Sequence, residues 1–95
     1  MSGWWVIVNP AAGRGRDLTQ RVEAALDARA IEYEARTSET PNAIARIVAE
    51  GRDLGYRGFL SVGGDGTANL VVNQLLGYEW PQSPTLGILP AGSGS

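Results

Sequence analysis

The 95-residue sequence contains no lysine, histidine or cysteine, and all eight of its basic residues are arginines. These absences exclude several reaction types within the chain: Ser-His-Asp and Cys-His nucleophile systems, Schiff-base lysines and the P-loop lysine. Disulfides and zinc sites built from histidine and cysteine are excluded as well. The lack of cysteine leaves the redox compartment undetermined.

Charge and hydrophobic patterning limit the kinds of partner that this chain can bind. The formal net charge of −2 argues against a general nucleic-acid binder, since such proteins carry a basic face. Any phosphate site must therefore be confined to a small part of the surface. The first eight residues have no basic segment and only a short apolar run, so they predict neither a signal peptide nor stable membrane insertion, and we expect a cytoplasmic protein.

The order of apolar and polar residues predicts strands near 4–8, 31–37, 58–62 and 85–89, alternating with helices near 17–29, 41–53 and 67–76. The first and third strands are continuous apolar runs, which indicates neighbouring central strands buried on both faces. The second strand alternates and is expected near the sheet edge. This order predicts an α/β fold, a three-layer, mostly parallel open sheet of Rossmann-like type.

Local signals mark where the helices begin. We expect Asp17, Thr40 and Thr67 to cap the three helices, and Pro41 strengthens the second of these starts. The apolar spacing predicts that Leu76 faces the core at the end of the third helix and extends the buried stripe of the second helix to Leu54.

A glycine-rich turn follows the third predicted strand. Gly63, Gly64 and Gly66 surround Asp65, and such a turn presents bare backbone N–H groups to a ligand. A phosphate placed there would meet these amides and the positive end of the next helix together. The simpler interpretation is a tight turn in which Asp65 bonds its own backbone.

Loops rich in glycine or hydroxyl residues follow all four predicted strands, at 9–16, 37–38, 63–67 and 90–95. Open parallel sheets bind ligands outside the carboxyl ends of their strands, where the strand order reverses. The convergence of these loops therefore predicts a phosphate or nucleotide cleft. Arg14 and Arg16 suit forked contacts with a polyphosphate, although solvated arginines in a flexible loop would look the same.

Three segments together, 9–13, 63–67 and 86–95, resemble the diacylglycerol kinase catalytic domain. That family includes bacterial lipid kinases and sphingosine kinases and is distantly related to the NAD kinases. The resemblance implies that residues 1–95 are the amino-terminal nucleotide-binding part of a two-domain enzyme that uses ATP and Mg²⁺. The carboxyl-terminal lipid-binding domain, absent from the chain, would supply the general base and the metal-linked acidic residues.

By position, the resemblance also implies a set of nucleotide-binding residues. Asp65 among them would be catalytic, orienting a metal-bound water or the attacking hydroxyl. The set is Asn9, Pro10, Ala11, Ala12, Gly13, Thr37, Gly63, Gly64, Asp65, Gly66, Thr67 and Ser93. The sequence departs from the family pattern at Ser93, where Thr is usual, at Ser95, where Asn is usual, and at Leu70, where Glu is common.

Three functions follow as hypotheses. The first is the ATP-binding part of a kinase that phosphorylates a diacylglycerol- or sphingoid-type lipid hydroxyl. The second is an NAD kinase-like enzyme, which shares the Gly-Gly-Asp-Gly turn, although the 9–16 loop fits the lipid kinases better. The third is a non-catalytic nucleotide-binding α/β module, since fold alone does not determine function.

Overall fold

The computed structural model describes residues 3–9 and 15–90. In chain order the elements are β1 (Trp4–Val8), α1 (Gly15–Ala28), β2 (Tyr33–Thr37), α2 (Pro41–Asp53), β3 (Gly58–Gly63), α3 (Asp65–Leu76) and β4 (Thr85–Pro90). The strands form one sheet in the order β2-β1-β3-β4, and every neighbouring pair is parallel. The predicted alternation and the parallel sheet are confirmed.

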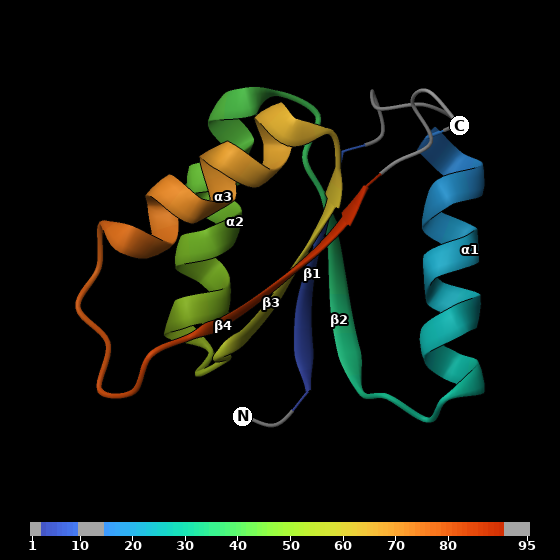
Figure 1. Ribbon diagram of the computed structural model, residues 1–95, viewed down its shortest axis with the longest axis horizontal. Helices are drawn as coiled ribbons and strands as arrows, with labels where there is room; N and C mark the ends of the chain where they lie inside the picture. Colours follow the sequence, from blue (N-terminus) through green and yellow to red (C-terminus); the bar gives the residue numbers. More distant parts are fainter. Residues whose placement is uncertain (1–2, 10–14, 91–95) are drawn as a thin grey trace.

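The sheet separates two helical layers (Figure 1). The helix α1 lies alone on one face, whereas α2 and α3 lie side by side on the other. The strands β1 and β3 occupy the centre and pair along their length, and β2 is at an edge, as their hydrophobic patterns predict. The three-layer α/β architecture is therefore confirmed.

The hydrophobic core is divided by the sheet into two clusters. The larger cluster lies beneath α2 and α3 and contains Trp5, Ile7, Ala43, Ile44, Ile47, Val48, Tyr56, Phe59, Val71 and Leu75. The smaller cluster lies beneath α1 and contains Val6, Val8, Val22 and Val62. Successive strand residues alternate between the clusters because side chains of a strand point to opposite faces.

Trp5 is the largest fully buried side chain of the larger cluster. Its indole Nε1 donates to the carbonyl oxygen of Ile47 at 2.8 Å, and its ring lies 5.1 Å from that of Tyr56. A Cβ at Gly51 would lie 2.5 Å from the Trp5 ring, so α2 approaches the sheet closely only because this helical position carries no side chain. The guanidinium of Arg36 covers the ring at 4.6 Å.

The connection between α3 and β4 is held by aromatic packing. The Trp80 ring lies 5.7 Å from Phe59 in an edge-to-face arrangement, and its Nε1 donates to the carbonyl oxygen of Leu75 at 2.8 Å. The guanidinium of Arg52 lies 4.5 Å from the centre of the Tyr78 ring. These contacts tie the far ends of α2 and α3 to each other and to the sheet.

Several predicted boundaries differ from the structure. The helix α1 begins at Gly15, two residues before the expected cap Asp17. The strand β2 begins at Tyr33 because the Ile31 N–H bonds back to the carbonyl of Leu26 and is held in the preceding turn. The helix α3 begins at Asp65, so Thr67 is not its cap.

Two leucines predicted to face the core are exposed. Leu54 follows the last residue of α2 and keeps 47% of its surface accessible, and Leu76 at the end of α3 keeps 78%. Leu54 is the C-cap residue of α2 and Leu76 is the last residue of α3, so both stand at the ends of their helices. The buried stripe of α3 instead ends one residue earlier, at Leu75.

Candidate functional site

The centre of the sheet contains a topological switch point. From β1 the chain crosses to β2 on one side, and from β3 it crosses to β4 on the other, while β1 and β3 are neighbours. The crossover helices consequently lie on opposite faces, and a crevice forms outside the carboxyl ends of the two central strands. Asn9 follows β1 and Gly63 ends β3, so both lie at this crevice.

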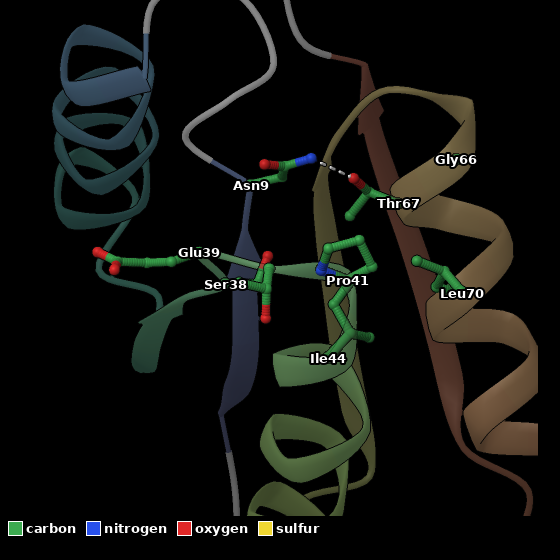
Figure 2. A pocket seen from close by; sticks show the side chains of 9 residues that line it. Asn9, Ser38, Glu39, Pro41, Ile44, Gly66, Thr67 and Leu70 are labelled. Atoms are coloured by element: carbon green, nitrogen blue, oxygen red, sulfur yellow. Dashed lines mark hydrogen bonds between the residues drawn. The ribbon is translucent and has the colours of Figure 1, made fainter.

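Asn9 connects three elements at the crevice. Its backbone N–H donates to the carbonyl of Val62 at 2.9 Å, which extends the pairing of β1 with β3. Its side-chain Nδ2 donates to the hydroxyl Oγ1 of Thr67 at 2.8 Å and thereby reaches the first turn of α3 (Figure 2). Two residues 58 positions apart are thus joined directly above the switch point.

The amino terminus of α3 opens toward the crevice. Its N-cap is Gly64, with φ −85° and ψ −175°, and no side chain caps it. The early N–H groups of a helix have no partner within the helix and carry its positive partial charge. A Cβ added at Gly64 or at Gly66 would meet nothing within 4 Å, so a ligand can approach this turn closely.

The amino terminus of α2 faces the same crevice. The Ser38 N–H bonds to the carbonyl of Val8 at 2.8 Å, which brings the loop after β2 against the end of β1. Thr40 then caps α2 by accepting from the Ala43 N–H at 3.3 Å, with Pro41 at the first position of the helix. The predicted entry of this helix is confirmed.

A cavity of about 280 Å³ lies between these two helix starts (Figure 2). It is lined by Asn9, Ser38, Glu39, Thr40, Pro41, Ile44, Gly66, Thr67 and Leu70. Pro41, Ile44 and Leu70 form apolar walls from α2 and α3, and hydroxyl and amide groups surround the mouth. Apolar walls with a few placed polar groups are typical of small-molecule sites.

The predicted site residues fall into three groups. Asn9, Gly66 and Thr67 line the cavity, with Gly63 and Gly64 in the adjoining turn. Thr37 ends β2 as an exposed residue and Asp65 is exposed in the first turn of α3, and neither is among the lining residues. The predicted positions 10–13 and Ser93 lie outside the described residues.

Sequence reasoning missed most of the wall contributed by the second loop and its helix. The lining residues outside the predicted set are Ser38, Glu39, Thr40, Pro41, Ile44 and Leu70, of which Ser38 belongs to the 37–38 loop that the sequence placed at the cleft. The available signal was the position of the 38–41 loop, which lies at the carboxyl edge of the sheet like the other candidate loops. Ile44 has the spacing of an ordinary core residue, and Leu70 stood out only as a departure from the family pattern.

A second hollow offers a contrast in charge. It measures about 680 Å³ along the outer edge of β2 and is lined by the carboxylates of Glu23, Asp27, Glu32 and Glu34, with Tyr33 among them. Desolvation raises the pKa of Tyr33, and the carboxylates of Asp27 and Glu23 raise it further. This surface repels anions, whereas two helix amino termini face the cavity between α2 and α3.

Within residues 3–9 and 15–90, no three histidine, cysteine or acidic residues come together as metal ligands. Within the same described residues, no helix is both long enough and apolar enough to cross a bilayer.

Fold and site together define an open parallel α/β domain with a crevice at its switch point. The family model "Diacylglycerol kinase catalytic domain" matches residues 3–95. A "Probable lipid kinase YegS" of Escherichia fergusonii is 37% identical over 83 residues, which cover 85% of this chain and 28% of that protein. A protein of the same name from Shigella flexneri is 47% identical over 49 residues. A "Probable lipid kinase YegS-like" of Cronobacter sakazakii is 43% identical over 49 residues.

The chain belongs to the diacylglycerol kinase catalytic domain family, since the match extends over nearly all of it. The resemblance inferred from the three motifs is confirmed. The chain spans less than a third of the length of the relatives it matches.

Proposed function

We propose that this chain is the ATP-binding part of a lipid kinase that transfers the γ-phosphate of ATP to the hydroxyl of a diacylglycerol- or sphingoid-type lipid. The observation that carries the proposal is the convergence of two helix amino termini and the glycine turn on one cavity in a chain of this family. The names of the relatives support a lipid as the acceptor. Use of ATP agrees with a cytoplasmic location.

The charge of the site supports a phosphate ligand. The uncapped first turn of α3 offers N–H groups beside Gly64 and Gly66, which have open space around them. A helix amino terminus of this kind binds anions through its N–H groups and its dipole. No lysine is needed for such a site, in agreement with a chain that contains none.

The apolar walls support a nucleobase in the cavity. Pro41 and Ile44 on α2 face Leu70 on α3, and a flat ring between them would bury its faces while its edge meets the hydroxyl and amide groups at the mouth. Burial of apolar surface contributes about 25 cal/mol per Å². Leu70, where Glu is common in the family, makes this wall more apolar.

Asp65 is proposed as the catalytic residue of the complete enzyme. Its carboxylate is exposed at the carboxyl edge of the sheet, where it is accessible to an acceptor hydroxyl or a metal-bound water. Mg²⁺ would arrive with ATP and be held mainly by phosphate oxygens and water, and Asp65 would orient a water bound to the ion or the attacking hydroxyl. The ion would neutralise charge on the transferring phosphoryl group.

The lipid-binding part of the enzyme is proposed to lie in the remainder of the longer protein that the relatives represent. We expect residues 1–95 alone to bind Mg-ATP only in the millimolar range, about −4 kcal/mol, because one wall of the cleft is open to water. Without the groups that position the acceptor, we expect no phosphoryl transfer.

Calorimetric titration of Mg-ATP and transfer of labelled phosphate test the proposal. Diacylglycerol, sphingosine and NAD⁺ serve as acceptors, each with the 95-residue chain and with the complete protein. We expect transfer to one of the lipids by the complete protein only. Transfer to NAD⁺ would support the NAD kinase-like alternative, nucleotide binding without transfer by the complete protein would support a non-catalytic module, and lipid phosphorylation by residues 1–95 would contradict the two-domain arrangement.

A further inference from the structure

In the described part of the chain, the hydroxyl of Thr67 accepts a hydrogen bond at the cavity and donates none. Thr67 is 4% exposed, lies in the first turn of α3 and lines the cavity. Its Oγ1 accepts a hydrogen bond from Asn9 Nδ2 at 2.8 Å. A hydroxyl has one proton to donate, and within residues 3–9 and 15–90 no group accepts that proton from Thr67.

The bond from Asn9 restricts where this proton can point. Because an N–H already occupies the side of the oxygen that faces Asn9, the hydroxyl proton is directed away from Asn9. Among the described residues the Thr67 hydroxyl is therefore a buried group that accepts one hydrogen bond and donates none, beside the uncapped first turn of α3. A buried donor without a partner costs free energy until a ligand accepts from it.

Gly63 makes this contact possible. A Cβ at Gly63 would lie 2.9 Å from Thr67 Oγ1 and 3.2 Å from the Cβ of Asn9. The bare backbone at the end of β3 thus leaves room for the two side chains to meet above it. The hydrogen bond between the amide and the hydroxyl thus joins the end of β1 to the first turn of α3.

We propose that Asn9 is a positioning residue, whose Nδ2 holds the Thr67 hydroxyl so that its proton is donated into the cavity to an anionic phosphate oxygen of the ligand. This inference rests on the proposed function for the identity of the ligand as a nucleotide. Asn9 acts through Thr67 and contributes to phosphate binding only while the hydroxyl is present. The reverse arrangement, in which Asn9 accepts the Thr67 proton, would leave no donor for the ligand.

A double-mutant cycle tests this dependence. Asn9→Ala, Thr67→Val and the double variant are titrated with Mg-ADP and, separately, with inorganic pyrophosphate, and binding is followed by NMR so that millimolar affinities are measurable. We expect Thr67→Val to weaken Mg-ADP binding about tenfold, as for the loss of one hydrogen bond to a charged group. Asn9→Ala should weaken it about threefold in the natural background and not at all beside Thr67→Val.

Conservative variants and a ligand-free signal separate positioning from structure. Thr67→Ser keeps the hydroxyl, so in its presence Asn9→Ala should again weaken binding, as it does beside the natural Thr67. Asn9→Asp offers only acceptors, so it should weaken binding more when Thr67 is present than beside Thr67→Val. In the unliganded protein, the Asn9 side-chain NH₂ signals should move toward those of a solvated amide in Thr67→Val. Thermal unfolding of each variant is measured beside binding.

Each outcome decides the inference. An equal loss from Asn9→Ala in both backgrounds would overturn it and indicate direct contact of Asn9 with the ligand. Coupling between the two residues in unfolding alone, with none in binding, would also overturn it and indicate a purely structural bond. If only pyrophosphate binds and the coupling is present, the positioning role holds while the nucleotide proposal fails, and if neither ligand binds, both are overturned.

Discussion

The two faces of the sheet differ in how they are packed. Among the described residues, the face beneath α2 and α3 buries ten hydrophobic side chains, with Trp5 and Phe59 fully enclosed, whereas the face beneath α1 buries four, all of them valines. The cavity lies on the side of the larger cluster, at the carboxyl edge of the sheet and between α2 and α3. The better packed face thus fixes the two helix starts relative to each other, which a preorganised site requires.

Removing one buried side chain from each cluster, Trp5 from the larger and Val22 from the smaller, tests this difference. Trp5→Ala should lower the free energy of unfolding by about 3–5 kcal/mol, because it leaves a large void and an unpaired Ile47 carbonyl. Val22→Ala on the other face should cost about 2 kcal/mol, since it deletes two methyl groups. Urea denaturation followed by circular dichroism measures both, and equal losses would contradict the ranking of the two faces.

Adding a methyl group at the end of β3 tests the packing of the site itself. Gly63→Ala should destabilise by about 1–3 kcal/mol, because its Cβ would overlap the contact between Asn9 and Thr67. Gly64→Ala is the matched control. Its Cβ meets nothing within 4 Å, and the loss should stay below about 1 kcal/mol at this N-cap. Thermal melts of the two variants give the comparison, and a Gly64 variant as unstable as the Gly63 variant would show that the close contact is not the cause.

The buried hydroxyl of Ser61, in β3, should have a smaller effect of opposite sign on the free energy of unfolding. Ser61 is 1% exposed in β3, and its Oγ has no hydrogen-bond partner among the described residues. Ser61→Ala should raise the free energy of unfolding by about 1 kcal/mol, since the desolvated hydroxyl is removed at little cost in packing. Calorimetric melting measures the change, and a lower melting temperature would indicate that a bound water satisfies this hydroxyl.

The smallest effect on stability is expected at Asp65, which belongs to neither cluster. Asp65→Asn should change the free energy of unfolding by at most about 1 kcal/mol, the loss of one charge at a helix start. Phosphoryl transfer by the complete protein should nevertheless fall by about 100-fold or more. Turnover is measured beside thermal unfolding, with Asp53→Asn at the other end of the neighbouring helix α2 as the control. Collapsed melting with normal activity per folded molecule would make Asp65 a structural turn residue.

Elements with strong local signals could be predicted from the sequence. The strand β1 occupies 4–8 as predicted because a continuous apolar run is closed by Asn9 and a proline. The helix α2 occupies 41–53 as predicted because Thr40 and Pro41 satisfy the local requirements of a helix start. The adjacency of β1 and β3 also followed from the sequence, since the strands that are apolar throughout must occupy the centre, where both faces are covered.

Only the tertiary structure decided how the site is assembled. Thr67 carries the signal of a helix cap, but Gly64 begins α3 earlier and frees the hydroxyl to meet Asn9, 58 residues away. Ile44 has the spacing of a core residue, yet it lines the cavity together with Leu70, because their turns lie at the open end of two packed helices. Local sequence determines which residues form a helix or strand, whereas contacts between distant residues depend on where the sheet ends and how its helices pack across it.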